Sequence, residues 1–470
     1  AATTGAAPRR VAIVGSGPAG FYTAQRLFRA TEAQADGGIQ VDMLEALPVP
    51  HGLARFGVAP DHPEVKSVTH KFERLAADPR FRYFGNVRVG RDVAVTELRE
   101  AYDAVVLAYG AEQDRQLGVP GETLPGVLSA RDFVGWYNGL PDCQPLGDKI
   151  RAWLRNTEEA AVFGVGNVAL DVARILLMPL AELAKTDITE EALATLHESR
   201  VRHVHLVGRR GPLQVAFTAK ELREMVNLPD TRLVVDLPYL RQTLTDAQET
   251  LSKTRALKRL MDLLLKGAEA SASEAGAQAS RSWHLHFLRS PVEFFADTAN
   301  GHVSGVRLER NTLVDGRAQG TGEMESLACG LALRSIGYKS VPVEGTPFDR
   351  RTGIVPNEAG RVVDQGQSVP RLYVAGWLKR GPTGVIASTL WDAQETADAL
   401  LADLAQGAGT SAETSADALP QLLRARGIRY VTHSEWQQLD AHETRTGEQR
   451  GKPREKLTSI ERMLHMLKPS

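Results

Sequence analysis

The segment Gly15-Ser-Gly-Pro-Ala-Gly20 has the glycine spacing of a turn that binds phosphate. It follows the apolar run Val11–Val14, which is typical of a buried strand, and precedes the helical pattern of Phe21–Ala30. In such a unit the first glycine permits a tight turn, the second admits a pyrophosphate, and the third lets the helix pack on the strand. The phosphate then lies at a helix N-terminus, where free N–H groups favour anions. Because Glu45 ends the next expected strand, 41–45, the sequence predicts a dinucleotide site formed by Gly15, Gly17, Gly20 and Glu45.

A second turn of the same kind occurs at Gly164-Val-Gly-Asn-Val-Ala169, with alanine in the third position. Its partner strand, 203–208, continues into Arg209 and Arg210 rather than into an acid. A carboxylate accepts hydrogen bonds from a ribose hydroxyl. It repels a 2'-phosphate by several kcal/mol at about 4 Å. Arginines instead offer forked hydrogen-bond donors to a 2'-phosphate. The first site is therefore expected to bind FAD or NAD and the second NADPH. The alternative is that the two arginines are a solvated surface pair.

The long separation between Ala169 and Arg209 requires an insertion in the crossover, roughly from Pro179 to Arg202. A third strand–turn–helix pattern runs through Arg371–Gly376 and Gly381-Pro-Thr-Gly384. This turn either approaches the far end of a bound FAD or is an ordinary connection.

The elements that must position these turns are strands alternating with helices, so the sequence predicts an α/β protein with parallel sheets and two nucleotide-binding domains. Two tracts of small residues, Gly267–Ser280 and Gln406–Ala418, are expected to be loops or linkers.

Composition excludes several classes of function. The 470 residues contain 56 Lys and Arg against 57 Asp and Glu, so a nucleic-acid-binding surface over the whole protein is not expected. The two cysteines, Cys143 and Cys329, are too far apart in sequence for a Cys-x-x-Cys redox pair, and two are too few for a four-thiolate metal site. We therefore expect neither disulfide reduction nor a metal centre. Charges interrupt the longest apolar run, Val168–Ala184, so no membrane span is expected.

Several longer segments, together with the three turns, resemble the adrenodoxin reductase family, the FAD-dependent NADPH:ferredoxin reductases of mitochondria and some bacteria. The segments are Pro48–Lys66, Ser129–Pro141, Gly208–Thr218, Arg334–Ser340 and Gly451–Leu457. The similarity covers nearly the whole chain after its first eight residues.

The resemblance implies two Rossmann-like domains, arranged as in glutathione reductase but without its dimerisation domain. Residues 1–112 would form the first part of the FAD-binding domain, 113–341 the NADP-binding domain, and 342–470 the second part of the FAD-binding domain. By this likeness the residues that contact FAD would be Ala19, Glu45, Leu53, Val89, Trp377, Gly384, Val385 and Ile386. Those that contact NADP(H) would be Gly164, Val165, Gly166, Asn167, Val168, Arg209, Arg210, Glu221 and Gly384.

The same resemblance implies an acidic [2Fe-2S] ferredoxin, adrenodoxin-like, as the partner. An apolar helical stripe of Leu257, Leu260, Met261 and Leu264 leaves cations on the other sides of the helix. We expect Arg223, Arg255, Lys258 and Arg259 to bind the ferredoxin, the alternative being a solvated helix face.

The implied reaction is hydride transfer from NADPH to FAD, followed by two one-electron transfers to the ferredoxin, which in turn supplies mitochondrial cytochromes P450 of steroid metabolism. His62 and Glu221 are the titratable residues expected nearest the two reacting rings. The expected setting is the mitochondrial matrix, peripheral to the inner membrane, with a monomeric protein. Two alternatives remain open: an NADPH-dependent quinone reductase, and a non-catalytic NADPH- and FAD-binding subunit of a larger complex.

Overall fold

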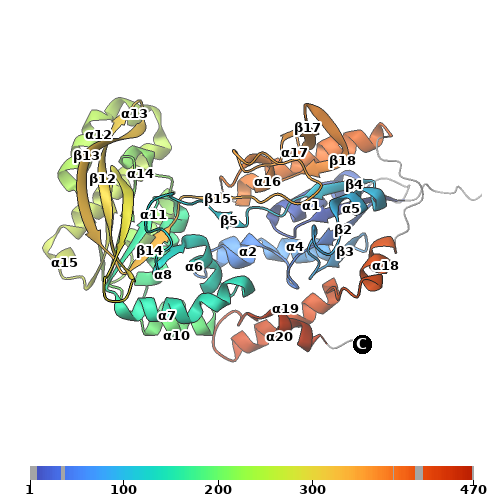
Figure 1. The fold of residues 1–470 in the computed structure, drawn as a ribbon, viewed down its shortest axis with the longest axis horizontal. Coiled ribbons are helices and arrows are strands. Elements are labelled where there is room, and N and C mark those ends of the chain that lie inside the picture. Colours follow the sequence, from blue (N-terminus) through green and yellow to red (C-terminus); the bar gives the residue numbers. More distant parts are fainter. Residues whose placement is uncertain (1–7, 33–37, 385, 408–416, 468–470) are drawn as a thin grey trace, which may run out of the picture.

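The computed structural model describes residues 8–32, 38–384, 386–407 and 417–467. The described chain forms two α/β units, each built on a mainly parallel sheet, and a third, antiparallel sheet that packs on one of them. The units lie side by side, with both ends of the described chain in the same unit (Figure 1). The predicted α/β class with two Rossmann-like domains is therefore confirmed.

The first unit contains a seven-stranded sheet of order β16-β17-β18-β4-β1-β2-β3. Its parallel strands are β1 (Arg9–Val14), β2 (Ile39–Leu44), β3 (Phe81–Phe84), β4 (Ala104–Leu107) and β18 (Gln367–Val374). An antiparallel edge is added by β17 (Arg361–Asp364) and β16 (Asn357–Glu358). Strands from the two ends of the chain thus share one sheet, because β18 pairs directly with β4.

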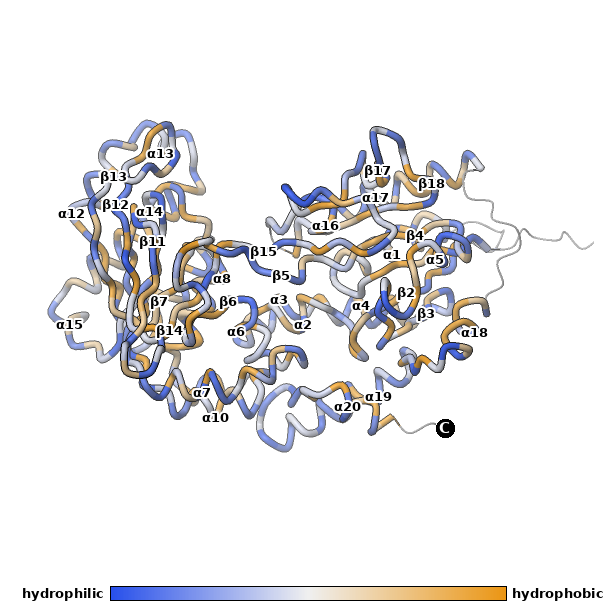
Figure 2. Tube along the Cα trace, in the orientation of Figure 1, coloured by the Kyte–Doolittle hydropathy of each residue, from blue (hydrophilic) through white to orange (hydrophobic). Residues whose placement is uncertain are grey.

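Alternation along β1 gives this sheet two apolar faces. Val11 and Ile13 face a core shared with α1 (Pro18–Ala30), α4 (Thr69–Ala76), α17 (Ile386–Ala405), α19 (His433–Glu448) and α20 (Ile460–Met466). Ala12 and Val14 face a second core, which is closed by α5 (Val95–Ala101), α16 (Trp377–Arg380) and α18 (Ala418–Ala425). Figure 2 shows the matching concentration of hydrophobic residues along the central strands. The short helices α2 (Leu53–Phe56) and α3 (Pro63–Lys66) lie on the side facing the other unit.

The second unit contains a six-stranded, fully parallel sheet of order β6-β14-β7-β8-β10-β9. Its strands are β6 (Val127–Ser129), β7 (Glu159–Phe163), β8 (His203–Val207), β9 (Thr231–Val235), β10 (Arg281–His286) and β14 (Leu331–Arg334). The helices on one face bury the largest core of the described chain. They are α6 (Ala130–Tyr137), α7 (Gly147–Asn156), α8 (Asn167–Leu177), α11 (Ala219–Val226), α12 (Leu237–Asp246), α13 (Gln248–Lys253) and α14 (Arg255–Ser271), with the 3-10 turns Pro141–Leu146 and Pro212–Gln214.

The opposite face of this sheet is covered by the antiparallel strands β11 (Arg289–Ala296), β12 (Val303–Val314) and β13 (Arg317–Ala328). Phe294, Val306 and Leu308 from this outer sheet pack on Phe163 and Val207. The two units are connected by β5 (Gln113–Asp114) and β15 (Tyr338–Lys339), which pair with each other between them (Figure 1).

The predicted insertion in the crossover after α8 is a packed helical element. It forms α9 (Leu180–Leu183) and α10 (Glu190–His197), and Leu183, Ile188 and Leu196 are buried in the core of the second unit. The tract 267–280, expected to be a loop, instead continues α14 as far as Ser271 and then forms α15 (Glu274–Ala277). Alanine favours helix, and the buried Ala268 keeps the last turns of α14 on the core, so tertiary packing and propensity act together. Most of the second tract, residues 408–416, lies outside the described residues.

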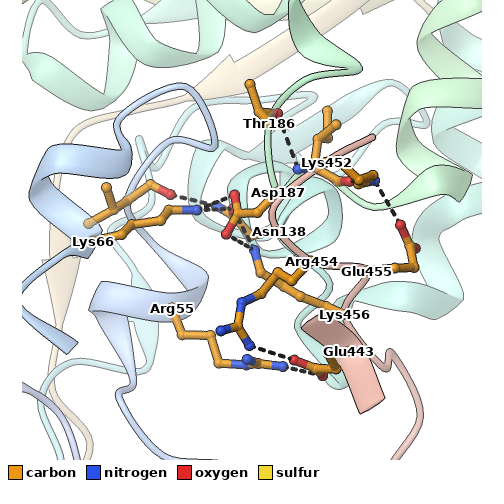
Figure 3. A network of polar contacts seen from close by, with 12 residues as sticks. Arg55, Lys66, Asn138, Thr186, Asp187, Glu443, Lys452, Arg454, Glu455 and Lys456 are labelled. Carbon is orange, nitrogen blue, oxygen red and sulfur yellow. Dashed lines mark hydrogen bonds and ion pairs between the residues drawn. The ribbon is translucent and has the colours of Figure 1, made fainter. Parts of the chain in front are cut away.

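Charged side chains join the crossover insertion to the first unit (Figure 3). Asp187 accepts from Lys66 at 2.6 Å and pairs with Lys456 at 2.9 Å, and all three residues are largely buried. Although burial opposes it, the two ammonium groups hold the pKa of Asp187 below its ordinary value. Burial lowers the pKa of each lysine. One carboxylate therefore bridges ammonium groups from two distant segments.

The C-terminal segment 451–457 is fixed by a neighbouring carboxylate, Glu443 of α19. Glu443 is fully buried and pairs with Arg55 at 2.5 Å and with Arg454 at 3.0 Å. Its Oε1 also accepts from the backbone N–H of Leu457 at 2.8 Å. Figure 3 shows the result, in which the C-terminal segment lies between α2 and the crossover insertion.

Replacing Asp187 by alanine should destabilise the protein strongly, because it leaves the two lysine ammonium groups buried without a counter-charge. We expect a loss of about 3–5 kcal/mol in the free energy of unfolding, measured by urea denaturation followed by circular dichroism. Glu182→Ala is the matched control, since it removes the exposed pair with Lys185 and should cost no more than about 1 kcal/mol. Equal effects of the two substitutions would show that the buried triad does not stabilise the junction.

Candidate functional site

The first glycine turn has the geometry that the sequence predicts. Gly15 adopts φ of 107°, and a Cβ there would lie 2.6 Å from the carbonyl oxygen of Ala108. A Cβ on Gly20 would lie 2.2 Å from the carbonyl oxygen of Gly15, so helix and turn touch through backbone alone. Around a Cβ built on Gly17, no atom of the described residues lies within 4 Å, apart from those of its chain neighbours. The turn is thus closed on two sides and open at its middle glycine, where α1 begins without a side-chain cap.

Glu45 lies directly beside this turn, where it was predicted. Its Oε2 accepts from the backbone N–H of Ser16 at 3.0 Å and from the Ser16 hydroxyl at 2.6 Å, and its Oε1 accepts from the N–H of Leu47 at 3.1 Å. Burial raises the pKa of the Glu45 carboxyl, and these hydrogen bonds oppose that shift. The carboxylate is therefore held in one orientation at the edge of the open turn.

Three of the other residues expected around this turn come from segments that pack on it. The loop before Leu53 is tied to the turn because the N–H of His51 donates to the carbonyl of Ser16 at 3.0 Å. Trp377 follows Gly376, and a Cβ built on Gly376 would lie 2.6 Å from the Cβ of Ala19. Ile386 begins α17, which packs along α1.

The remaining expected contacts of this turn are less directly placed. Val89 lies two residues beyond Val87, whose N–H donates to the carbonyl of Glu45 at 2.8 Å. Gly384 is exposed and adopts φ of 81° just before α17. Val385 lies outside the described residues.

The second glycine turn repeats this geometry in the six-stranded unit. Gly164 adopts φ of 137°, and a Cβ there would lie 2.1 Å from the carbonyl oxygen of Ser335. At Gly166 the nearest atom to a built Cβ is the Ala216 side chain at 3.9 Å, so this position is almost open. Helix α8 begins at Asn167 with no side-chain cap on its first turn. The third position, Ala169, has its Cβ fully buried against the sheet, where alanine fits in place of glycine.

The residues around the second turn are held by two further contacts. The N–H of Ala216 donates to the carbonyl of Val165 at 2.9 Å, and the side chain of Asn167 accepts from the N–H of Thr218 at 2.8 Å. Val168 is partly buried against the same core. The predicted segment 164–168 is therefore a single, well-braced turn.

Arg209 and Arg210 follow β8 and are both exposed. Their backbone is anchored, since Asn311 donates to the carbonyl of Arg209 at 2.9 Å and the N–H of Leu288 to that of Arg210 at 3.1 Å. Within the described residues neither guanidinium has an ion-pair or hydrogen-bond partner. Two free guanidinium groups on a fixed loop suit a phosphate, which each can bind through two donors.

A buried charged cluster joins the two units, and the sequence reasoning missed most of it. Arg174 of α8 is 1% exposed and contacts Asp61 of the first unit at 2.5 Å and Asp171 at 2.8 Å. It also approaches Glu221 at 3.4 Å and His62 at 3.0 Å. Burial alone would raise the pKa of Asp61. The guanidinium of Arg174 stabilises the Asp61 carboxylate, and the pKa is lowered as a result. The signal that could have found Arg174 is its place, with Asp171, inside an otherwise apolar helix.

The two predicted titratable residues, His62 and Glu221, meet in this cluster. The Nε2 of His62 lies 3.6 Å from Glu221 and 2.6 Å from Glu224. Burial, reinforced by the nearby Asp171, raises the pKa of Glu221 to about 7. The structure thus brings together one residue from each unit, and it gives Glu221 a proton affinity suited to neutral pH.

The four predicted partner-binding cations lie on two helices that pack against each other, α11 and α14. Arg223, Arg255, Lys258 and Arg259 are all exposed. The ammonium of Lys258 pairs with Asp262 at 3.0 Å, while the guanidinium groups of the three arginines have no acidic partner in the described part of the chain. On the other side of α14, Leu260, Met261 and Leu264 are buried and Leu257 is partly buried, as the stripe predicts.

The two cysteines lie in different cores of the second unit. Cys143 and Cys329 are both buried and unpaired, and burial raises the pKa of each thiol to about 12. Neither can serve as an electron-relaying thiolate at neutral pH.

Residues 9–228 match the family model described as "Pyridine nucleotide-disulphide oxidoreductase". The chain is 52% identical to the mitochondrial NADPH:adrenodoxin oxidoreductase of Homo sapiens, over 97% of this chain and 92% of the relative. It is 44% identical to the NADPH-ferredoxin reductase FprA of Mycobacterium tuberculosis, over 98% and 99% of the two chains. A solved structure of that protein, described as FprA in complex with NADPH, superposes with a TM-score of 0.90 over 97% of this chain and 99% of the other. With this identity over nearly its full length, the chain belongs to the family of NADPH:adrenodoxin oxidoreductases and NADPH-ferredoxin reductases.

Proposed function

We propose that this protein transfers electrons from NADPH, through FAD, to a [2Fe-2S] ferredoxin. The observation that carries the proposal is a pair of similar open turns with opposite charges beside them, Glu45 at one and Arg209 with Arg210 at the other. Bound FAD would supply the step that joins a two-electron donor to a one-electron acceptor. The names of the relatives, which are NADPH-dependent reductases of adrenodoxin and ferredoxin, support the same reaction.

FAD fits the first turn. The open middle glycine, Gly17, leaves room for a pyrophosphate against the N-terminus of α1, and Glu45 can accept from ribose hydroxyls. The other residues that we assign to this site are Gly15, Ala19, Gly20, Leu53, Val89, Trp377, Gly384, Val385 and Ile386. We assign residues 1–112 and 342–470 to the FAD-binding domain, since their strands share one sheet.

NADPH fits the second turn. Gly166 opens toward the N-terminus of α8, and the unpaired guanidinium groups of Arg209 and Arg210 can bind a 2'-phosphate. Gly164, Val165, Asn167, Val168, Glu221 and Gly384 complete the site that we assign. Residues 113–341 would form the NADP-binding domain.

The charged cluster around Arg174 would fix the approach of the two nucleotides. The Arg174–Asp61 pair holds the loop that carries His62 against the helix that carries Asp171. We assign His62 Nε2 and the Glu221 carboxyl to orienting the reacting rings and adjusting the charge around them. Because its pKa lies near 7, Glu221 can hold a proton there at neutral pH.

The partner that we propose is an acidic ferredoxin of the adrenodoxin type, bound by Arg223, Arg255, Lys258 and Arg259. Arg223, Arg255 and Arg259 have no acidic partner among the described residues, and such cations speed the encounter with a negatively charged protein. By likeness to the mitochondrial relatives, we place the reaction in the mitochondrial matrix, with a monomeric protein peripheral to the inner membrane that supplies cytochromes P450. Within the described residues no helix is long and apolar enough to cross a membrane.

Replacing both Arg209 and Arg210 by alanine should remove the preference for NADPH over NADH. Loss of two charge-assisted contacts, each about 1.5 kcal/mol or more, should lower kcat/KM for NADPH by about 100-fold, while kcat/KM for NADH stays within a few-fold. Steady-state kinetics with both nucleotides and a small electron acceptor measures this. Arg200→Ala, which removes an exposed arginine paired with Glu158, should change neither value. A double variant that kept its preference would place the 2'-phosphate elsewhere.

Reversing two of the partner-binding charges, with Arg255→Glu and Arg259→Glu together, should slow reduction of a [2Fe-2S] ferredoxin at low ionic strength. Reduction of a small acceptor by NADPH should be unaffected, because neither glycine turn is altered. The charge-matched control is Arg424→Glu with Arg445→Glu, two exposed arginines of α18 and α19 in the other unit. Equal losses with ferredoxin and with the small acceptor, or equal effects of the two double variants, would argue against docking at α14.

Glu221→Gln should increase the stability of the protein at high pH more than at low pH. The folded-state pKa of Glu221 is raised to about 7, so the protonated carboxyl is favoured in the folded protein, and that stability is lost as pH rises through about 7. Glutamine cannot ionise, so its advantage over wild type should grow by up to about 3 kcal/mol between pH 5 and pH 8. Urea denaturation across this pH range measures the difference. A pH-independent difference would mean that Glu221 titrates normally.

A further inference from the structure

Four histidines lie on two adjacent parallel strands of the six-stranded sheet. His203 and His205 are on β8, and His284 and His286 are on β10. Residues two apart on a strand point to the same face, and His205 is directly opposite His284 in the register. His205 is also opposite Ala161, which belongs to the core under the outer sheet β11–β13. The histidines therefore gather on the face away from the helices.

Three of these rings converge on one point. One ring nitrogen from each of His205, His284 and His286 lies within 4.8 Å of the other two. The Nδ1 of His205 and the Nε2 of His286 are 2.9 Å apart, and the ring centroids of His205 and His284 are 4.4 Å apart. A tetrahedral ion bound to imidazole nitrogens at about 2.0–2.1 Å holds two of them about 3.3 Å apart. Small side-chain rotations would thus bring all three nitrogens to binding distance.

A carboxylate fixes the proton of the central ring. The Nε2 of His205 lies 2.7 Å from the Oε2 of Glu159, and since a carboxylate only accepts, Nε2 carries the hydrogen. The lone pair of His205 is then on Nδ1, the atom that faces His286. A histidine that binds a metal through one nitrogen and donates to a carboxylate through the other is the usual arrangement in metal sites.

The cluster can be reached from solvent. The rings of His284 and His286 are only partly buried, and the side chain of Glu159 is 37% exposed, so an ion can enter. The nearby cation Arg289 is paired with Glu325 at 2.6 Å, which offsets its charge.

We propose that His205, His284 and His286 bind a divalent transition-metal ion of the Zn²⁺ class, with Glu159 as the carboxylate that orients His205. The ion would connect β8 to β10 just before the loop that carries Arg209. Neutral imidazoles suit zinc, copper and nickel rather than magnesium or calcium, which prefer oxygen ligands. The fourth position is open to water.

The other group of candidate ligands in the described chain does not suit a metal. His62, Glu221 and Glu224 also come close together, but the guanidinium of Arg174 lies 3.0 Å from His62 and 3.5 Å from Glu224. A cation already occupies the centre of that cluster. Among the described residues, no Lys or Arg side chain is hydrogen-bonded to the three histidines.

The test is calorimetric titration of the EDTA-treated, FAD-containing protein with Zn²⁺. We expect one tight site per chain. His284→Ala with His286→Ala should weaken that binding at least 100-fold, and Glu159→Gln should weaken it about 10–100-fold. The control, His197→Ala, removes an exposed histidine of α10 and should leave binding unchanged.

Titration with Co²⁺ gives an independent readout that does not depend on enzyme activity. A histidine-bound ion should give visible absorption bands that are absent from the double variant, while the circular dichroism of that variant shows that it is folded. Glu159→Gln retains all three ligands and keeps the test decisive if the double variant does not fold. Absence of a stoichiometric Zn²⁺ site in the wild-type protein, or undiminished binding by the histidine or glutamate variants, would overturn the proposal.

Discussion

The buried ion pair between Arg174 and Asp61 determines how the two halves of this protein can work together. Arg174 is on α8, the helix whose N-terminus forms the second glycine turn. Asp61 follows α2. The residue before α2, Gly52, packs against Gly17 of the first glycine turn. Burying a guanidinium is costly unless carboxylates surround it, and here Asp61 and Asp171 do so at 2.5 and 2.8 Å. One contact thus links the two glycine turns. The side chains that would act between the nucleotides are held around this contact.

The two glycine turns show how one backbone conformation can suit two different ligands. In each, a glycine with positive φ makes the turn, an open glycine admits a phosphate, and a small residue brings helix to strand. The distinction comes from the end of a neighbouring strand. There Glu45 is fixed by Ser16 and Leu47, while the guanidinium groups of Arg209 and Arg210 have no partner among the residues that the structure describes. A fixed acceptor suits ribose hydroxyls, and exposed forked donors suit a phosphate. We infer that charge at these strand ends, rather than the shape of the turn, selects the nucleotide.

The sequence predicted the features that depend on local pattern. Glycine spacing predicted the positions of both turns, and the ends of the expected strands predicted the positions of Glu45 and the arginine pair. The 3.6-residue period of apolar residues predicted the buried side of α14. It did not predict the cluster around Arg174, because Asp61 and His62 lie more than one hundred positions before Arg174 in the sequence and meet it only across the junction. The outer sheet β11–β13 was also missed, since most of β13 is exposed and its polar sequence carries no clear alternation. Small residues at 267–271 suggested a loop, yet buried Ala268 shows that packing continues the helix.

Electron flow from NADPH through FAD to ferredoxin is measured most directly by an anaerobic titration of the purified flavoprotein with NADPH, followed by its visible spectrum. We expect that one equivalent of NADPH bleaches the flavin, that NADH does so far less readily, and that oxidised [2Fe-2S] ferredoxin restores the original spectrum. A flavin that stays unbleached by NADPH, or one that ferredoxin does not reoxidise, would contradict it.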